Sequence, residues 1–245
     1  MQPEHPHAAS AELLAARVLQ VRMDTKFILK ASALDALLGT LYDDYAVVVS
    51  GSQTNARYDN LYFDTPAHLA LTSHHRGVRP RFKVRIRHHL DRQMSFLEVK
   101  EKRNTNRTHK QRMAIPFMTE DLDAAALQFI QHHCPIDPRT LRQSMRIRFS
   151  RMTLVGRHSQ ERITLDSHLQ FSAGEAHTDL PGTVITEVKQ ERYRPTTTVM
   201  RALRAAKAHQ MSLSKYCTAA QLLLPHIKMN RYRPRLRMLR RHAHA

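Results

Sequence analysis

The sequence predicts one domain of the α+β class, an antiparallel β-barrel with flanking helices. The chain has 245 residues, which is an ordinary length for a single barrel and enough to bury a sizeable core. Six segments alternate charged and apolar residues with the period of two that a β-strand imposes. No repeat or domain boundary interrupts residues 20–224, so we expect one continuous unit there.

The predicted elements follow one another between turn signals such as Asp64-Thr65-Pro66. Residues 1–19 are expected to be a partly disordered N-terminal segment with a short helix over 11–19. Strands are expected at 21–29, 45–49, 57–63, 81–88, 95–102, 108–115, 145–155, 161–166 and 183–192. Helices are expected at 32–41, 121–133, 196–209 and 214–224.

The last segment, residues 225–245, differs in composition from the rest of the chain. It carries seven cations and no acid, which is typical of a solvated, disordered basic tail. The alternative for this tail is contact with an anionic membrane surface, a membrane-protein partner or nucleic acid.

The whole chain is strongly basic, with 39 Lys and Arg against 21 Asp and Glu and a net charge of +18. This excess indicates an anionic partner: nucleic acid, a membrane surface or a phosphate-rich substrate. Cys134 and Cys217 lack the spacing of a metal site or disulfide framework and indicate reduced thiols in a cytoplasmic protein. No run of about 18 apolar residues occurs, so we expect no transmembrane segment and at most a peripheral membrane association.

The most informative pattern is the position of charges within the strands. In residues 81–87, Arg81, Lys83, Arg85 and Arg87 share one face, and the apolar residues between them share the other. The arrangement recurs in further strands, whose charged faces hold Arg22, Asp24 and Lys26; Glu98, Lys100 and Lys102; Lys110 and Arg112; Arg162 and Asp166; and Glu187 and Lys189. The apolar faces are therefore expected to pack outward or against helices.

These charged faces have two interpretations. A sheet with one solvent-exposed face is common in antiparallel proteins. Like charges that face each other across strands are destabilising, however, and arginine binds phosphate oxygens with two parallel hydrogen bonds. We therefore favour a phosphate-binding concavity, in which Glu98 and Glu187 hold a hard divalent cation that bridges phosphates.

Nine short motifs occur in a fixed order along the chain. They are Arg22-x-Asp24-x-Lys26-Phe27, Tyr62-Phe63-Asp64-Thr65, Lys83-x-Arg85-x-Arg87, Phe96-Leu97-Glu98-x-Lys100, Lys110-x-Arg112, Phe149-x-Arg151, Arg162-x-Thr164-x-Asp166, Glu187-x-Lys189 and Ser214-Lys215-Tyr216. Together they resemble the catalytic domain of the vacuolar transporter chaperone (VTC) polyphosphate polymerases, which belongs to the triphosphate tunnel metalloenzyme superfamily. The resemblance runs from about residue 20 to residue 224.

The resemblance implies an antiparallel barrel that forms a tunnel with inward-pointing charges. It also implies that the γ-phosphoryl group of ATP is transferred to a growing inorganic polyphosphate chain, with Mn²⁺ or Mg²⁺ as cofactor. By motif position, catalytic roles fall to Lys26, Arg85, Arg87, Lys100, Arg151 and Arg162. Phosphate-binding roles are assigned to Arg22, Lys83, Lys110, Arg112, Lys189 and Lys215. The resemblance gives the metal to Glu187, and the charge pattern adds Glu98.

Two residues depart from the family's pattern: Asp24 stands where Glu is expected, and Phe149 where Tyr is expected. One alternative function is a metal-dependent tripolyphosphatase or nucleoside triphosphatase in the same tunnel. The first strand disfavours it because the Glu-x-Glu-x-Lys triad associated with that branch is absent. The other alternative is a non-enzymatic module that binds RNA or another polyanion. An aromatic content of 6% and the lack of Trp disfavour nucleic acid.

Overall fold

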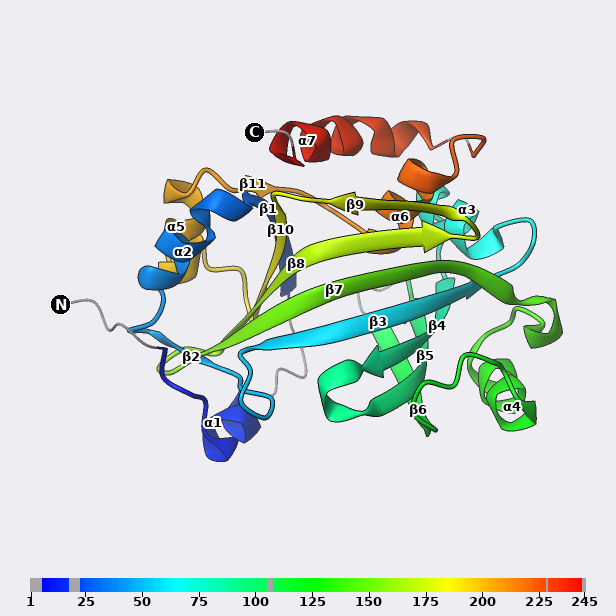
Figure 1. Cartoon of the computed structure of the whole chain (residues 1–245), viewed down its shortest axis with the longest axis horizontal. Coiled ribbons are helices and arrows are strands. Elements are labelled where there is room, and N and C mark those ends of the chain that lie inside the picture. Colours follow the sequence, from blue (N-terminus) through cyan, green and yellow to red (C-terminus); the bar gives the residue numbers. More distant parts are fainter. Residues whose placement is uncertain (1–5, 18–22, 105–107, 228, 244–245) are drawn as a thin grey trace.

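An eleven-stranded antiparallel sheet forms the centre of the molecule (Figure 1). The computed structural model describes residues 6–17, 23–104, 108–227 and 229–243. The strand order is β11-β1-β10-β8-β7-β3-β4-β5-β6, and β2 pairs with β7 and β9 with β8. The strands are β1 Met23–Lys30, β2 Tyr45–Val47, β3 Asn55–Asp64, β4 Arg81–His89, β5 Met94–Lys102, β6 Thr108–Ile115, β7 Arg142–Gly156, β8 Glu161–Ala173, β9 Ala176–Leu180, β10 Thr183–Gln190 and β11 His209–Gln210.

Short helices flank this sheet. In Figure 1, α2 and α5 lie together at one end of the molecule, α4 lies at the opposite end, and α7 runs along the top. The helices are α1 Ala11–Ala16, α2 Leu34–Gly39, α3 Leu69–Arg76, α4 Ala124–His133, α5 Thr198–Ala205, α6 Lys215–Leu223 and α7 Arg233–Ala243. Within the described ranges, no helix has both the length and the apolar character needed to cross a membrane.

The outward faces of the strands are apolar and covered by helices. Val84 and Ile86 of β4 pack with Ile130 of α4 in one buried cluster. Val188 of β10 packs with Leu203 of α5 in a second cluster. Burial of these apolar faces stabilises the sheet by about 25 cal/mol for each Å² removed from water. The prediction that the apolar faces pack outward against helices is confirmed.

The sheet curls, so that strands far apart in its order approach each other. Lys26 Nζ on β1 donates to the Leu213 carbonyl at 2.9 Å, and Lys83 Nζ on β4 donates to Ser214 Oγ at 2.9 Å. Consecutive residues before α6 therefore join two strands that have four others between them.

The α+β class is confirmed, but hydrogen bonds do not close a barrel, because β11 and β6 are the two edges of the described sheet.

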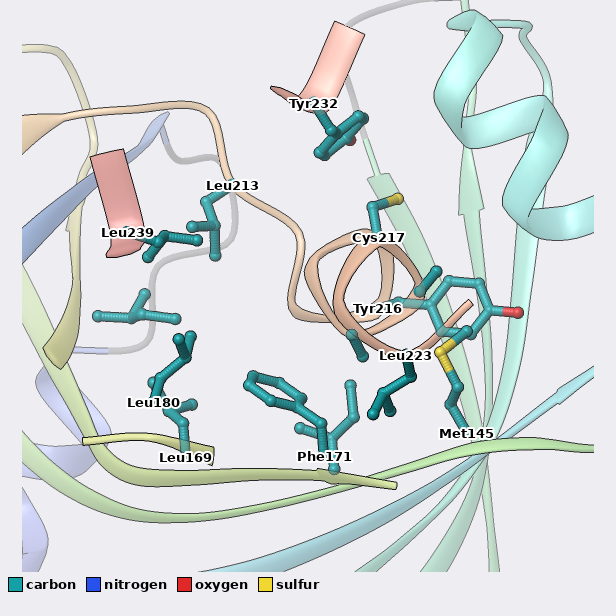
Figure 2. Close-up of a cluster of buried hydrophobic side chains, with 14 of the residues drawn as sticks. Met145, Leu169, Phe171, Leu180, Leu213, Tyr216, Cys217, Leu223, Tyr232 and Leu239 are labelled. Atoms are coloured by element: carbon teal, nitrogen blue, oxygen red, sulfur yellow. The ribbon is translucent and has the colours of Figure 1, made fainter. Parts of the chain in front are cut away.

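Helix α6 fills one end of the curl. Figure 2 shows Tyr216 and Leu223 of α6 in a buried cluster with Met145 of β7 and Phe171 of β8. These two strand residues lie on the concave side of the sheet. The concave side is therefore apolar where α6 packs, and the charged residues occupy the rest of it.

Asp64 fixes the position of α6. Tyr216 donates its hydroxyl hydrogen to Asp64 Oδ2 at 2.6 Å, and Asp64 also accepts from the backbone N–H groups of Ala70 and Leu71 at 2.8 and 3.0 Å. One buried carboxylate thus joins the end of β3, the start of α3 and the start of α6. Bonds of this kind to a charged group contribute about 1.5–3 kcal/mol each.

Most of the predicted elements are confirmed, with shifted ends. The strand expected at 108–115 has these limits, whereas β7 and β8 are longer than expected. Helix α3 and strand β9 were not predicted. The helix expected at 196–209 ends at Ala205, and His209–Gln210 forms β11 instead. His209 and Gln210 form a strand because they pair with β1, and such a tertiary pairing cannot be recognised in the local sequence. Residues 18–19 and 21–22 of the expected first helix and strand lie outside the described residues.

The prediction of a solvated, disordered tail is wrong for residues 229–243. This segment forms a 3₁₀ turn at Asn230–Tyr232 and then α7. Met229, Tyr232 and Leu239 are buried in the cluster around α6. The high density of arginine concealed apolar residues at helical spacing, such as Leu236 and Leu239.

Docking of α7 can be tested with Leu239→Ala. Leu239 is 1% exposed, and truncation of a buried leucine costs about 2–5 kcal/mol. We expect trypsin to cleave the arginine-rich α7 roughly tenfold faster or more in this variant, while the sheet resists. Leu236→Ala, at a partly exposed position, is the control and should have a smaller effect. Equal cleavage rates in wild type and Leu239→Ala would contradict the docked helix.

Candidate active site on the concave face

Cross-strand pairing places the charged residues on one continuous surface. Residues opposite each other on neighbouring strands point to the same face of a sheet. The pairs on the concave face include Tyr62–Arg85, Arg85–Glu98, Lys83–Lys100, Glu98–Arg112, Arg151–Asp166, Arg162–Lys189 and Lys26–Glu187. Alternation within each strand and register between strands are therefore sufficient to gather the predicted residues.

Glu98 on β5 is the central anion of one wall of the concave face, which β4, β5 and β6 form. Its side chain is only 4% exposed. Arg85 Nε donates to Glu98 Oε2 at 2.7 Å, and Arg85 Nη1 donates to the Tyr62 hydroxyl at 2.9 Å. Lys110 Nζ lies 3.1 Å from Oε1, and Arg87 Nε lies 3.9 Å from Oε2. Burial raises the pKa of a carboxyl, but these cations outweigh it and hold the pKa of Glu98 well below its usual range. Glu98 therefore stays ionised, orients Arg85 and places a negative charge beside Arg87.

Asp166 on β8 is the central anion of the other wall, which β7, β8, β10 and β1 form. Its side chain is 2% exposed. Arg151 binds it with two bonds, Nε to Oδ1 at 2.6 Å and Nη2 to Oδ2 at 2.8 Å. Lys215, the first residue of α6, donates to Oδ2 and lies 4.5 Å from the centre of the Phe149 ring. Burial opposes ionisation, but Arg151 and Lys215 lower the pKa of Asp166 to about 2. The sequence placed Asp166 on the charged face but assigned it no role.

Glu187 is the third carboxylate of the surface. It accepts from Lys189 and interacts with Lys26 and Asp24, and the charges of Lys26 and Lys189 outweigh its burial and lower its pKa well below the usual range. Lys189 Nζ also lies 3.6 Å from Asp24 Oδ1. Thr164 stands opposite Glu187, and its buried hydroxyl has no hydrogen-bond partner among the described residues. Three oxygen-bearing side chains therefore lie on neighbouring strands here.

Lys83 and Lys100 face each other across β4 and β5, close to Lys26. Enclosure in the concavity and repulsion from Lys83 and Lys26 lower the pKa of Lys100 to about 7. The Lys100 side chain is still reached by water, so an incoming ligand can reach it as well. Desolvation likewise lowers the pKa of Lys83. Crowded lysines of this kind lower their mutual repulsion when an anion binds between them.

Most of the predicted residues are brought together by the structure. These are Lys26, Lys83, Arg85, Arg87, Glu98, Lys100, Arg151, Glu187, Lys189 and Lys215. Lys110 and Arg112 lie on the edge strand β6 and are exposed, and Arg112 lies over the Phe96 ring at 5.0 Å. Arg162 pairs with Lys189 near the start of β8. Arg22 lies outside the described residues.

The sequence analysis assigned no site role to the polar residues of β3, although Tyr62 belongs to one of the nine motifs. Asn60 Oδ1 accepts from Arg87 Nε at 2.8 Å, and the Tyr62 hydroxyl accepts from Arg85. Tyr58 stacks on Phe149 with ring centres 5.3 Å apart. These three residues are spaced two apart, so the alternation that identified the charged faces could have found them.

Metal binding fits Glu187 better than Glu98. Among the described residues, no three His, Cys, Asp or Glu side chains gather into a complete metal site. Mg²⁺ and similar ions bind in other proteins through one or two carboxylates, waters and substrate phosphates. Glu187, Asp24 and the unpartnered Thr164 hydroxyl supply oxygens of this kind. Glu187 accepts from Lys189 through Oε1, whereas both oxygens of Glu98 accept from cations, Oε2 from Arg85 and Oε1 from Lys110.

The described residues form an antiparallel sheet that curls around a cation-lined concave face. Solved structures that share this fold, that of the triphosphate tunnel metalloenzymes, include the following two. A Hippeastrum protein assigned as an adenylyl cyclase and described as having a dominant triphosphatase activity aligns with TM-score 0.54 and 13% identity over 86% of this chain and 99% of its own. A Bacillus halodurans protein assigned as an adenylate cyclase aligns with TM-score 0.50 and 14% identity over 79% and 94%.

The sequence comparison is more specific than the structural one. The VTC domain family matches residues 21–224, so the chain belongs to the VTC domain family. No curated protein sequence matches this chain. The family assignment confirms the resemblance seen in the nine motifs.

The ion pairs of Asp166 predict a pH dependence of stability. The pKa of Asp166 is about 2 in the folded protein and about 3.9 in an unfolded chain. Its ionisation therefore contributes stability that is fully present above about pH 5 and is lost as the pH falls towards 2, on the order of 2–3 kcal/mol in all. We expect Asp166→Asn to lower the free energy of unfolding at pH 6 and to flatten its pH profile between pH 5 and 2.

Urea unfolding at several pH values measures this effect. Glu175→Gln, at an exposed position in the β8–β9 turn, is the control and should keep the wild-type profile. An Asp166→Asn profile as steep as that of wild type would contradict the assignment.

The lowered pKa of Lys100 predicts proton uptake on ligand binding. A bound phosphate chain favours the ammonium form, so the pKa of Lys100 should rise from about 7. At pH 8, wild type should take up more protons than Lys100→Arg by up to about one per tripolyphosphate bound, because arginine is always charged. Calorimetry in buffers of different ionisation enthalpy measures the difference. Lys207→Arg should behave as wild type, and equal uptake by all three proteins would refute the role of Lys100.

Proposed function

We propose that the protein is an ATP-dependent polyphosphate polymerase that transfers the γ-phosphoryl group of ATP to a growing inorganic polyphosphate chain. One observation carries the proposal: in a VTC-family chain, cations on both walls of a concave face are oriented by buried carboxylates. Arg85 with Glu98 and Arg151 with Asp166 are the two anchored pairs. A plain solvated surface does not require arginines that are fixed in this way.

The cations suit a linear phosphate chain. Arg85, Arg87 and Lys100 would contact phosphate oxygens from one wall, and Lys26 and Arg151 from the other. Phosphoryl transfer depends on the positioning of the reactants and on stabilisation of the charge that spreads over the transferred oxygens. Because Glu98 and Asp166 hold the arginines before substrate arrives, little reorganisation is needed during the reaction.

The transfer needs no strong general base in this chemistry. An oxygen of the acceptor's terminal phosphate is already ionised and forms the new bond to the γ-phosphorus of ATP. The bond from that phosphorus to the bridging oxygen breaks, and ADP leaves with the electron pair. Glu187, with Asp24 and Thr164, would hold Mn²⁺ or Mg²⁺, which supplies further neutralisation of phosphate charge when bound.

A metal-dependent tripolyphosphatase or nucleoside triphosphatase is the second candidate. It is favoured by the triphosphatase activity described for the Hippeastrum protein of the same fold. Hydrolysis requires activation of water, however, and the site carboxylates Glu98, Asp166 and Glu187 have lowered pKa values and are engaged by cations, which makes them poor bases. A simple RNA- or polyanion-binding module would not need buried carboxylates among its cations.

We also place the reaction in the cytoplasm, with ATP and polyphosphate as partners. One observation supports the compartment and another supports the partners. Cys134 and Cys217 are free and buried, as expected for a protein in a reducing compartment. The concave site also offers cations for phosphate rather than an apolar surface for lipid.

The product assay with two variants tests the function. Protein is incubated with ATP and Mn²⁺, and a gel separates long polymer from free phosphate. Wild type should make polymer. Arg87→Ala should lower turnover by roughly 10²-fold or more, because it removes an oriented electrostatic contact. Glu187→Gln should do the same, but excess Mn²⁺ should partly rescue only this variant, because it removes charge while keeping the shape of a metal-binding side chain.

Matched controls are Arg139→Ala and Glu175→Gln, two exposed residues outside the concave face, which should keep full activity. Free phosphate without polymer from wild type would assign the protein to the triphosphatases instead. A normal Mn²⁺ titration in Glu187→Gln would refute the metal role and leave Glu187 as an ion-pair partner of Lys189.

A further inference from the structure

Outside the concave site, α7 presents a dense cationic face. Its exposed arginines are Arg233, Arg237, Arg240 and Arg241, and their spacing of four, three and one places them on one side of the helix. Residues 225–245 contain no acid, so nothing within this segment offsets their charge. Like charges four residues apart destabilise a helix. An anion bound along this face would remove that cost.

The apolar side of α7 is already used inside the protein. Leu239 is buried in one cluster with Leu213 and Leu180 (Figure 2), and α7 lies against β1, β9 and β10. A helix that binds a membrane surface inserts its apolar face between the lipids. This face of α7 is occupied by the protein's own core, so the structure favours an anion that binds the arginines alone.

Cations connect α7 with the concave site. Arg81 lies two residues before Lys83 on the same face of β4 and stands opposite Lys102 on β5. Arg81 is also within electrostatic range of Tyr232, and Arg235 of α7 lies 4.6 Å from the centre of the Tyr232 ring. A series of positively charged side chains, Lys83, Arg81 and Arg235, with the Tyr232 ring between the last two, therefore leads from the concave site to α7.

A second contact holds the start of α7 beside this series. Arg231 Nη1 donates to the Arg76 carbonyl at the end of α3 at 3.0 Å. The positively charged side chains of Arg76 and Arg231 both act on the neighbouring His75. The segment that leads into α7 thus adds positive charge at the end of α3.

We propose that these cations form a binding track for linear inorganic polyphosphate, which extends from the concave site past Arg81 and Lys102 to the exposed arginines of α7. The proposal rests on the proposed function, because the phosphate chain is taken to occupy the concave site. The α7 helix adds about 16 Å to the track, from its 11 residues at 1.5 Å each. A tripolyphosphate engages the concave site alone, and only a longer chain also reaches α7.

Binding of long-chain polyphosphate and of tripolyphosphate, each measured at two or more salt concentrations, tests the track. The variant is the triple substitution Arg237→Gln, Arg240→Gln and Arg241→Gln. We expect roughly tenfold weaker binding of the long chain and a slope of log affinity against log salt that falls by about 2. Tripolyphosphate affinity should not change, which also shows that the concave site remains folded.

The control removes the same charge elsewhere, by Arg201→Gln, Arg204→Gln and Lys207→Gln at exposed positions on and after α5. It should bind both ligands as wild type does. Wild-type affinity of the α7 variant for the long chain would overturn the proposal, as would an equal loss in the control. Lost binding to phosphatidylserine vesicles with unchanged polyphosphate binding would assign α7 to a membrane and would also overturn it.

Failure of the proposed function gives a different result. Arg87→Ala should weaken tripolyphosphate binding, because Arg87 lies in the concave site. If it does not, the concave site is not the phosphate site and the proposed function fails, whatever the α7 variant does. If Arg87→Ala weakens both ligands and the α7 variant weakens neither, only the track is refuted.

Discussion

The rest of the structure depends on two buried carboxylates that make a cation-rich concavity tolerable. Curling the sheet brings arginines and lysines of facing walls together, which by itself is unfavourable. Glu98 and Asp166 offset this repulsion at two points and bind Arg85 and Arg151 in fixed orientations. Each carboxylate is buried and so requires its cations, because an unpaired buried charge costs several kcal/mol. The same interactions therefore hold the fold together and prepare the surface for phosphate.

The concave face could be predicted because its construction is local. Alternation within single strands identified nearly every charged residue that the structure brings together, and the order of the motifs identified the family. The partners of these residues could not be predicted in the same way. The pair of Arg151 with Asp166 depends on a register shift between Arg148 and Ser150, and Lys215 reaches Asp166 only because α6 packs inside the curl. Such contacts depend on tertiary packing rather than on sequence spacing.

The C-terminal segment shows how a strong compositional signal can mislead. Counting charges predicts a solvated tail, because few apolar residues interrupt the arginines. Whether the segment is ordered depends instead on the positions of those few residues. Tyr232 and Leu239 pack into the apolar cluster around α6. Burial of two or three large side chains, at about 1.5–3 kcal/mol each, is enough to order a short helix. Charge then determines which side of the helix faces the solvent.

Two lysines, Lys26 and Lys83, hold the chain before α6 in place. The attachment of this helix therefore depends on what the concavity binds. Lys26 and Lys83 donate to Leu213 and Ser214, and both face the site. An anion that competes for these ammonium groups weakens the attachment of α6. By thermodynamic reciprocity, any interaction that tightens that attachment weakens the hold of these lysines on the anion. Attachment of α6 and binding of an anion therefore compete for the same two ammonium groups, and re-formation of the two hydrogen bonds favours release of a bound chain.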